Sequence, residues 1–399
     1  MSCGNRCIIG ACTLQLTYSL LPIAKGVGLM RLATYNVENL FARARALNLD
    51  DSGAAKPILE RFAELNTIFE EPLYTDAMKA RMLRLLQDLG VDRKNDSRYV
   101  ILRENRGQLI SVSKLKGPRI VANGRGDWVG WLEMKTDVIN EVATRNTAQV
   151  VRDVDPDILA VVECEGRHAL QQFSHQLLPS VGGEAYEHVM VIEGNDDRGI
   201  DVGIMTKRGY KVGWMQSHAE DKTTVGDSVF SRDCPEYGVR TPKRETLWVL
   251  VNHFKSKGYG AQDASDRKRW LQAEAVRRIV DRLAAEKAEL IAVAGDLNDF
   301  PASAPLHPLL VDSGFKDIST HPAFKSDGRP GTFGRGSDRD KIDYILLSPA
   351  LFERVTGGGV WRKGVWGPNK SPLWDIYPEM KSSFHAGSDH ACLFADLDV

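Results

Sequence analysis

Eight short apolar runs follow one another from residue 31 to residue 399, and they restrict the fold more than any other feature of this sequence. They are RLATYNV (31–37), DILAVVE (157–163), HVMVIEG (188–194), DVGIMTK (201–207), TLWVLVNHF (246–254), LIAVAGDLN (290–298), KIDYILLS (341–348) and ACLFADLDV (391–399). Runs of this length and composition are typical of buried strands. Residues 135–155 and 264–290 have helical periodicity after polar starts. Buried strands separated by helices indicate a layered α/β domain.

Two segments depart from this alternation. Residues 42–130 contain a predicted helix near 76–89, and strand-like segments at 98–105 and 108–113 around a turn at Arg106-Gly107. We expect this insertion to form its own lobe or lid within a single domain that spans residues 30–399. Residues 1–29 precede Met30 and faintly resemble a signal peptide, so we interpret them as a leader or as the product of a misassigned start codon.

The charge balance limits how a substrate is held. A formal net charge of −1 excludes a global positive field that would draw the chain to nucleic acid or to an acidic membrane, so an anionic substrate must be bound locally. Three of the six cysteines crowd at the start and three are scattered, unlike those of a disulfide-stapled secreted domain. We therefore favour a cytoplasmic protein without a transmembrane anchor; secretion is the alternative if residues 1–29 act as a signal peptide.

Polar residues stand at the ends of six of these predicted strands. They are Asn36, Glu38, Glu163, His253, Asp296, Asn298, Asp343, Asp389 and His390. Carboxylates and amides are the oxygen ligands that hard divalent cations prefer. We therefore expect Glu163, Glu38 and Asp389 to hold Mg²⁺, with Mn²⁺ as a substitute. The absence of a Cys/His ligand set argues against a dedicated zinc site.

Six motifs carry a resemblance to a known family. NVENL, DILAVVECE, NHFKSKG, GDLND, KIDYIL and GSDHACLFADL occur in this order and resemble the signature blocks of the endonuclease/exonuclease/phosphatase superfamily. The resemblance spans residues 31–42 and roughly 135–399. It implies a four-layer α/β/β/α sandwich, in which two mixed sheets pack face to face with helices outside. It also implies metal-dependent hydrolysis of a phosphoester by in-line attack of water.

The resemblance assigns roles to the first group of polar residues. Glu163 resembles the principal metal ligand, with Asn36 and Glu38 beside it. Asp296 resembles the residue that orients or deprotonates the attacking water, and Asn298 the amide that donates to the phosphate. A carboxylate can accept a proton, whereas a neutral amide contacts a phosphate oxygen without titrating.

The two histidines and their neighbours complete the implied site. His390 resembles the histidine that contacts the scissile phosphate, and Asp343 the carboxylate that fixes its tautomer and supports its positive charge. Asp389 would point towards the metal or a second metal. His253 would be a second phosphate-contacting histidine, able to stabilise charge or to protonate the leaving oxygen.

Several basic and aromatic residues are candidates for substrate binding. Arg198 and Arg232 are candidate phosphate clamps, with a surface ion pair as the alternative. Lys255 and Lys257 contact flanking phosphates or only keep their loop soluble. The segment at about 359–385 contains Trp361, Trp366 and Trp374 among basic residues, so it is either a packed cap or a stacking platform for bases.

Three functions remain open at this point. The first is a metal-dependent nuclease that acts on DNA or RNA, which the aromatic and basic segment favours. The second is a phosphatase or phosphodiesterase that acts on a small metabolite or a lipid headgroup, which the near-neutral charge favours. A non-catalytic scaffold is disfavoured because every motif residue is present. The sequence implies a phosphate-containing substrate but no stable protein partner, and it leaves the oligomeric state open.

Overall fold

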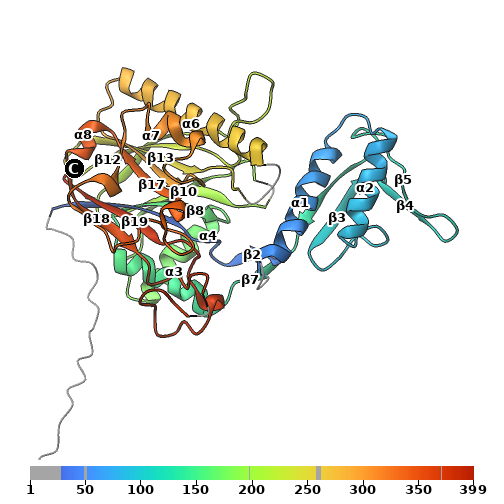
Figure 1. Ribbon diagram of the computed structural model, residues 1–399, viewed down its shortest axis with the longest axis horizontal. Helices are drawn as coiled ribbons and strands as arrows, with labels where there is room; N and C mark the ends of the chain where they lie inside the picture. The colour runs from blue at the N-terminus through green and yellow to red at the C-terminus, as the bar shows by residue number, and fades with distance from the viewer. Residues whose placement is uncertain (1–27, 49–51, 197, 258–261, 370) are drawn as a thin grey trace, which may run out of the picture.

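A computed structural model describes residues 28–48, 52–196, 198–257, 262–369 and 371–399 (Figure 1). Apart from residues 28 and 29, the predicted leader lies outside the described residues. Among the described residues, no helix combines the length and the apolarity that crossing a membrane requires.

The first of two large sheets is mixed and, within the described residues, has seven strands. Its central strand β1 (Met30–Asn36) runs parallel to β8 and antiparallel to β19. In spatial order the strands are β16 (Phe324–Lys325), β18 (Val355–Trp361), β19 (Cys392–Leu397), β1, β8 (Ile158–Cys164), β10 (Asp201–Thr206) and β9 (His188–Ile192).

The second large sheet is also mixed and has six strands in the described residues. Its central strands β13 and β14 are parallel, and β14 is antiparallel to β17. In spatial order the strands are β11 (Lys211–Gln216), β12 (Glu236–Arg240), β13 (Thr246–His253), β14 (Ile291–Asp296), β17 (Asp343–Leu347) and β15 (Lys316–Asp317).

The two sheets bury one face against each other. Side chains from both, such as Leu32 of β1 and Val249 of β13, form a single apolar cluster. On the other face of the first sheet, α3 (Glu141–Val154) packs through Val150, with α4 (Arg167–Gln172) and α5 (Leu178–Ser180) nearby. On the other face of the second, α6 (Gln262–Ala285) packs through Val276. The predicted α/β class, with large mixed sheets and helices, is confirmed.

Outside the insertion, the remaining helical elements of the described residues are short. They are α7 (His307–Leu310), α8 (Pro349–Phe352), a π-helical turn (Phe173–Leu177) and several single turns of 3-10 helix. Helix α3 begins at Glu141, later than the predicted start of periodicity at residue 135. The delay has a local cause, since residues 136–138 pair as a strand and the Asn140 side chain caps the helix by accepting from Val142 N.

The insertion forms a lobe with its own apolar core (Figure 1). Its elements are α1 (Ser52–Phe69), α2 (Asp76–Asp88), β3 (Val100–Arg106), β4 (Ile110–Ser113), β5 (Gly117–Ile120) and β6 (Val129–Met134). Trp128 is fully buried there, with its ring 4.9 Å from that of Phe69 and its Nε1 donating to the Tyr74 hydroxyl at 2.9 Å. The paired strands β2 (Ala42–Ala44) and β7 (Thr136–Val138) connect the lobe to the sheets.

The two predicted strand-like segments around Arg106-Gly107 form strands in the lobe but do not pair with each other. Strand β3 pairs with β6, and β4 pairs with β5. Glu104 supplies a local reason, because its Oε1 accepts from Leu109 N at 2.7 Å and so takes the place of a strand partner. The predicted helix near residues 76–89 is confirmed as α2.

Candidate active site

Strand pairing places three of the predicted residues in one row. His253 at the end of β13 lies opposite Asp296 at the end of β14, and Asp296 lies opposite Asp343 at the start of β17. Because β17 is antiparallel to β14, its first residue reaches the same sheet edge as the last residue of β14. The row is buried, with His253 3%, Asp296 1% and Asp343 1% exposed.

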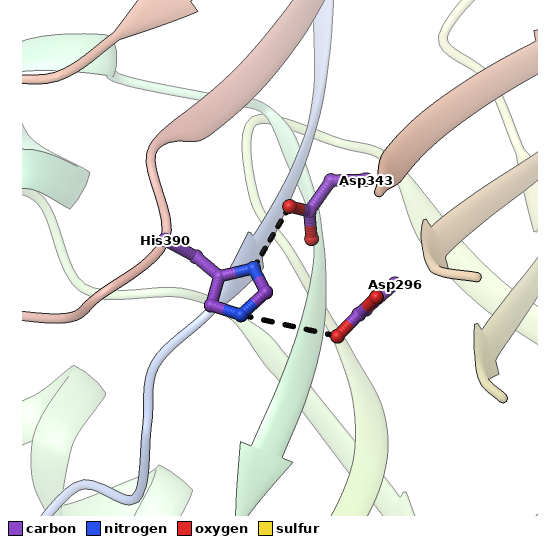
Figure 2. Close-up of side chains that lie close together, drawn as sticks. All are labelled: Asp296, Asp343 and His390. Atoms are coloured by element: carbon purple, nitrogen blue, oxygen red, sulfur yellow. Dashed lines mark hydrogen bonds and ion pairs between the residues drawn. The ribbon is translucent and has the colours of Figure 1, made fainter. Parts of the chain in front are cut away.

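His390 lies between the two aspartates of this row. Its Nδ1 is 2.8 Å from Asp343 Oδ2, and its Nε2 is 3.9 Å from Asp296 Oδ2 (Figure 2). Thr332 Oγ1 also donates to Asp343 Oδ2, at 2.5 Å. Burial opposes a charge on His390, but Asp343 and then Asp389 and Asp296 raise the pKa of its imidazole well above the ordinary value. An imidazolium at this position balances the neighbouring carboxylates.

Asp296 is the most contacted carboxylate of the site. Its Oδ1 accepts from Asn298 N at 2.8 Å, while its Oδ2 accepts from Asn298 Nδ2 at 3.1 Å and from Asn36 Nδ2 at 3.4 Å. Burial first, and Asp343 next, raise the pKa of the Asp296 carboxyl to about 8. Its side chain can therefore hold or accept a proton near neutral pH.

His253 has the opposite electrostatic environment. Burial, followed by the charges of Arg232 and Arg198, lowers the pKa of His253 well below its ordinary value, so its imidazole is neutral. Its Nε2 lies 3.4 Å from Glu163 Oε1 and 3.7 Å from Asp296 Oδ2. Among the described residues, its Nδ1 has no hydrogen-bond partner. A neutral imidazole suits a donor to a phosphate oxygen.

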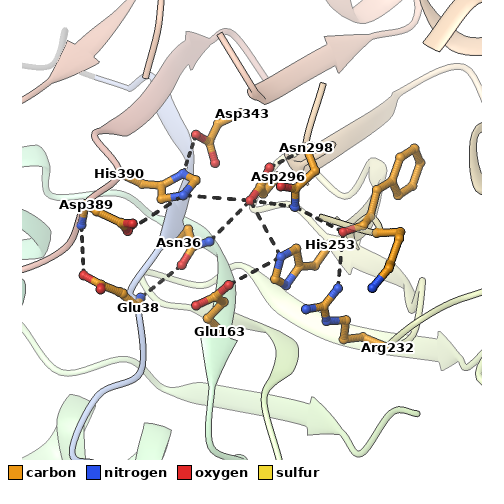
Figure 3. Close-up of polar contacts among 12 residues, drawn as sticks. Asn36, Glu38, Glu163, Arg232, His253, Asp296, Asn298, Asp343, Asp389 and His390 are labelled. Carbon is orange, nitrogen blue, oxygen red and sulfur yellow. Dashed lines mark hydrogen bonds and ion pairs between the residues drawn. The ribbon is translucent and has the colours of Figure 1, made fainter. Parts of the chain in front are cut away.

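Two of the predicted metal ligands, Glu38 and Asp389, lie on the other side of Asn36 from Asp296 and His253, whereas the third, Glu163, lies beside His253 (Figure 3). Glu38 Oε2 accepts from Asp389 N at 3.1 Å, and Glu38 N donates to Asn36 Oδ1 at 3.0 Å. Burial, Asp389 and Glu163 raise the pKa of Glu38 to about 8, against the opposing charge of Arg43. Oxygen donors that repel one another in this way fit a hard divalent cation, which would relieve the repulsion.

Backbone strain is concentrated at the same residues. Of the eight non-glycine residues with positive φ in the described part of the chain, four lie here: Glu38 (49°), Asn39 (64°), Glu163 (65°) and Asn298 (53°). Side chains rarely adopt this left-handed region, and such strain clusters at functional sites. Glu165, which sequence reasoning missed, holds the strained loop by accepting from Leu40, Phe41 and Ala42 N. Its position two residues after Glu163, in the ECE motif, is the sequence signal that could have identified it.

One of the predicted cationic residues, Arg232, borders the site through a carbonyl that it shares with Asn298. Arg232 Nη1 and Asn298 Nδ2 both donate to the Phe254 carbonyl, at 3.2 and 3.1 Å. Arg198 and Arg232 share the carboxylate of Asp196. Burial, with Arg232 and Arg198, lowers the pKa of the Lys255 ammonium to about 8. Arg232, Arg198 and Lys255 thus form a cationic group next to the row of His253, Asp296 and Asp343.

Lys257 has a different environment. It forms an ion pair with Asp299, a carboxylate that also pairs with the buried Arg269, and its ammonium lies 4.7 Å from the ring centroid of Phe300. Its charge is therefore balanced within the loop, and its proposed contact with a flanking phosphate stays a prediction.

The three predicted tryptophans have different environments. Trp361 packs against the core and donates to the Tyr377 hydroxyl at 3.2 Å, and Trp374 donates to the Val365 carbonyl at 2.8 Å. Trp366 lines a cavity of about 460 Å³ together with Phe333 and Phe384. Glu38 and Asp389 line the same cavity, which therefore opens beside the predicted metal ligands. No sequence signal pointed to Phe333 or Phe384.

Known proteins resemble this chain in sequence and in fold. The model of the Endonuclease/Exonuclease/phosphatase family matches residues 120–326, just over half of the chain. No curated protein matches the chain. Similar solved structures include a mannosyl-6-phosphatase of Bacteroides thetaiotaomicron VPI-5482, with 19% identity, a TM-score of 0.47, and coverage of 64% of this chain and 91% of that chain.

Two further structures are similar to a comparable extent. Truncated TDP2 of Caenorhabditis elegans has 15% identity and a TM-score of 0.45, over 65% of this chain and 92% of that chain. The human Nocturnin catalytic domain has 15% identity and a TM-score of 0.44, over 65% of this chain and 87% of that chain. The family model matches more than half of the sequence, and on this basis the chain belongs to the endonuclease/exonuclease/phosphatase family.

Proposed function

We propose that this phosphoesterase is a divalent-metal-dependent nuclease that hydrolyses a phosphodiester by attack of an activated water. The observation that carries the proposal is the buried row of His253, Asp296 and Asp343 with His390 set against it, beside the carboxylates of Glu38 and Glu163. Each part of this arrangement has a defined use in phosphodiester hydrolysis.

The proposed proton transfers use the carboxylate and imidazole groups of the row. Asp296 orients the water and accepts its proton, a task that its raised pKa favours. His390, held as an imidazolium by Asp343, donates to a non-bridging oxygen of the phosphate and stabilises the charge that develops there. Asn298 donates to the same phosphate through its amide. His253 is a neutral imidazole and has no acidic proton to give to the leaving oxygen, so its proposed role is to stabilise charge there by donating a hydrogen bond.

A divalent cation has candidate ligands in Glu163, Glu38 and Asp389, with the Asn36 amide oxygen beside them. When bound, Mg²⁺ or Mn²⁺ would polarise the phosphate and neutralise its charge. We favour Mg²⁺ because a few carboxylates and an amide, with room for water, match its ligand preference.

The aromatic cavity beside Glu38 and Asp389 favours a nucleic acid as the substrate. Phe333 and Phe384 are 36% and 57% exposed, and Trp366 lies with them in the cavity wall. Exposed aromatic rings next to a phosphate-binding centre suit stacking of an unpaired base. Single-stranded DNA or RNA is therefore the first substrate to test.

A phosphatase that acts on a small metabolite or a lipid headgroup is the second candidate. The net charge of −1 favours it, because nothing in the overall charge attracts a long polyanion. One substrate panel separates the two candidates: plasmid DNA, single-stranded DNA, RNA, bis-p-nitrophenyl phosphate and a phosphate monoester, each with Mg²⁺, Mn²⁺ or EDTA.

Asp296→Ala serves as the control for contaminating nucleases in this panel. Metal-dependent cleavage of nucleic acid that Asp296→Ala abolishes supports the nuclease. Metal-dependent hydrolysis of the monoester alone would instead indicate that the substrate is a small metabolite or a lipid headgroup. Turnover that EDTA leaves unchanged, or that survives in Asp296→Ala, would contradict the proposed chemistry.

A further inference from the structure

A second cavity, of about 450 Å³, lies between the inserted lobe and the sheets. None of the residues in the catalytic row lines it, but Arg232 does, and the Phe254 carbonyl accepts from both Arg232 and Asn298. The cavity therefore adjoins the proposed site of phosphate attack. In Figure 3, Arg232 lies on the opposite side of the row from Glu38 and Asp389.

The side of this cavity that lies outside the inserted lobe is strongly cationic. Within the described residues, the lining includes one carboxylate and four cationic side chains: Asp196, Arg198, Arg232, Lys255 and Lys268. Asp196 is shared by two guanidinium groups, at 2.8 Å from each. Arg232 is only 2% exposed. Concentrated positive charge at a partly dry site is costly on its own, and a bound anion offsets that cost.

The wall contributed by the inserted lobe is apolar. Leu59 and Phe62 of α1, together with Met134 at the end of β6, line this side of the cavity. Ser231 and Ser256 add hydroxyl groups near the cationic side. A ligand that fits both walls carries an anionic group joined to an apolar or planar part, as a nucleotide does.

We propose that this cavity binds a second phosphate of the substrate, which flanks the scissile phosphate on the side away from Glu38 and Asp389. The inserted lobe then acts as a specificity element, because its apolar wall holds the group that joins the two phosphates. This assignment rests on the proposed phosphodiesterase function. It also explains how a chain without a net positive charge holds a polyanion, since guanidinium and ammonium groups are gathered at one subsite.

The test compares dinucleotides that have one phosphodiester and either no terminal phosphate, a 5′ phosphate or a 3′ phosphate. For one of the two phosphorylated forms, kcat/KM should exceed that of the unphosphorylated form by roughly tenfold or more, as expected for one added charge-assisted contact. Lys268→Ala should reduce this preference, and Lys268→Arg should restore it. Arg278→Ala, on the same helix but 62% exposed and outside the cavity, should retain the native preference.

A trinucleotide without terminal phosphates identifies the source of the second phosphate. Cleavage as efficient as that of the preferred phosphorylated dinucleotide shows that an internal backbone phosphate fills the cavity. Poor cleavage shows that the cavity requires a terminal monoester. Both results retain a second phosphate as the ligand.

Failure of the subsite is distinguishable from failure of the nuclease proposal. Equal kcat/KM for all three dinucleotides would overturn the subsite and leave the nuclease in place. If no dinucleotide is cleaved, cleavage of single-stranded DNA and RNA still decides the nuclease proposal, and calorimetric binding of the same dinucleotides to Asp296→Ala protein tests the subsite. Equal affinity with and without the terminal phosphate would then overturn it, whereas tighter binding that Lys268→Ala weakens supports it.

Discussion

At the scale of single residues, the contact between Asp343 and His390 is the most informative. Asp343 Oδ2 lies 2.8 Å from His390 Nδ1, which directs Nε2 towards Asp296. We expect Asp343→Asn to lower kcat by roughly 10²- to 10⁴-fold with little change in KM, because the imidazole loses its orienting and charge-supporting partner. The alkaline limb of the kcat–pH profile should also move to lower pH.

Kinetics over a range of pH, with Asp312→Asn as an exposed control, measure this effect. A kcat that falls without any change in the pH profile would argue that Asp343 has only a structural role.

Glu163 carries a separate prediction about the metal. Replacing it with Gln removes one negative charge from the group that includes Glu38, so the concentration of Mg²⁺ needed for half-maximal activity should rise about tenfold or more. Titration of activity with Mg²⁺ and Mn²⁺ provides the measurement. Glu193→Gln, at an exposed position, is the matched control. An unchanged titration in Glu163→Gln would show that Glu163 is not a ligand.

At the scale of elements, the stretch from the end of β18 to β19 contains aromatic residues with two different roles. Trp361, the last residue of β18, is partly buried and packs against the core, so Trp361→Ala should lower the free energy of unfolding by about 2 kcal/mol. Phe384 is 57% exposed in the cavity wall, so Phe384→Ala should leave stability nearly unchanged. It should instead raise KM for single-stranded DNA about tenfold, because one stacking contact is lost.

Urea denaturation and steady-state kinetics on both variants test this division. An unchanged KM in Phe384→Ala would remove the base-stacking role from the cavity.

Some elements could be predicted from their local sequence, and others could not. The eight apolar runs all contain the expected strands, since a buried strand needs only a local run of apolar residues. Helix α1 was not predicted from the sequence; Pro57 lies within it, and a proline inside a helical pattern normally indicates that the helix ends. Strand β18 was not predicted either, because its sequence, VTGGGVW, has three consecutive glycines and therefore a low strand propensity. It nevertheless pairs with β19.

At the scale of the whole molecule, the buried acidic groups predict how stability depends on pH. The pKa of Asp296 is about 8 in the folded protein. Between roughly pH 4 and 8 the folded state therefore keeps a proton that the unfolded chain has released, and the free energy of unfolding falls as pH rises. Glu38 and His390, whose pKa values are also raised, act in the same direction. His253, whose pKa is lowered, opposes them near neutral pH.

Metal-free protein and its Asp296→Asn variant isolate the contribution of Asp296. The variant should gain stability relative to the native protein on going from about pH 5 to about pH 8, since it has no charge to bury. Added Mg²⁺ should raise the Tm of the native protein more at the higher pH, where the carboxylates ionise more easily. Thermal unfolding at both pH values measures this, and a constant difference between native and variant would contradict the assignment.

The sequence by itself determined the chemical groups of the site and their order along the chain. Each motif lies at the end or start of an apolar run, and that placement depends on residues only a few positions apart. Only the tertiary structure decided which groups meet. Asp343 contacts His390 across 47 positions, Asp196 is shared by two arginines, and Phe62 of the inserted lobe faces the cavity that Arg232 lines. Such contacts depend on strand register and on the packing of distant segments, which no local pattern of residues encodes.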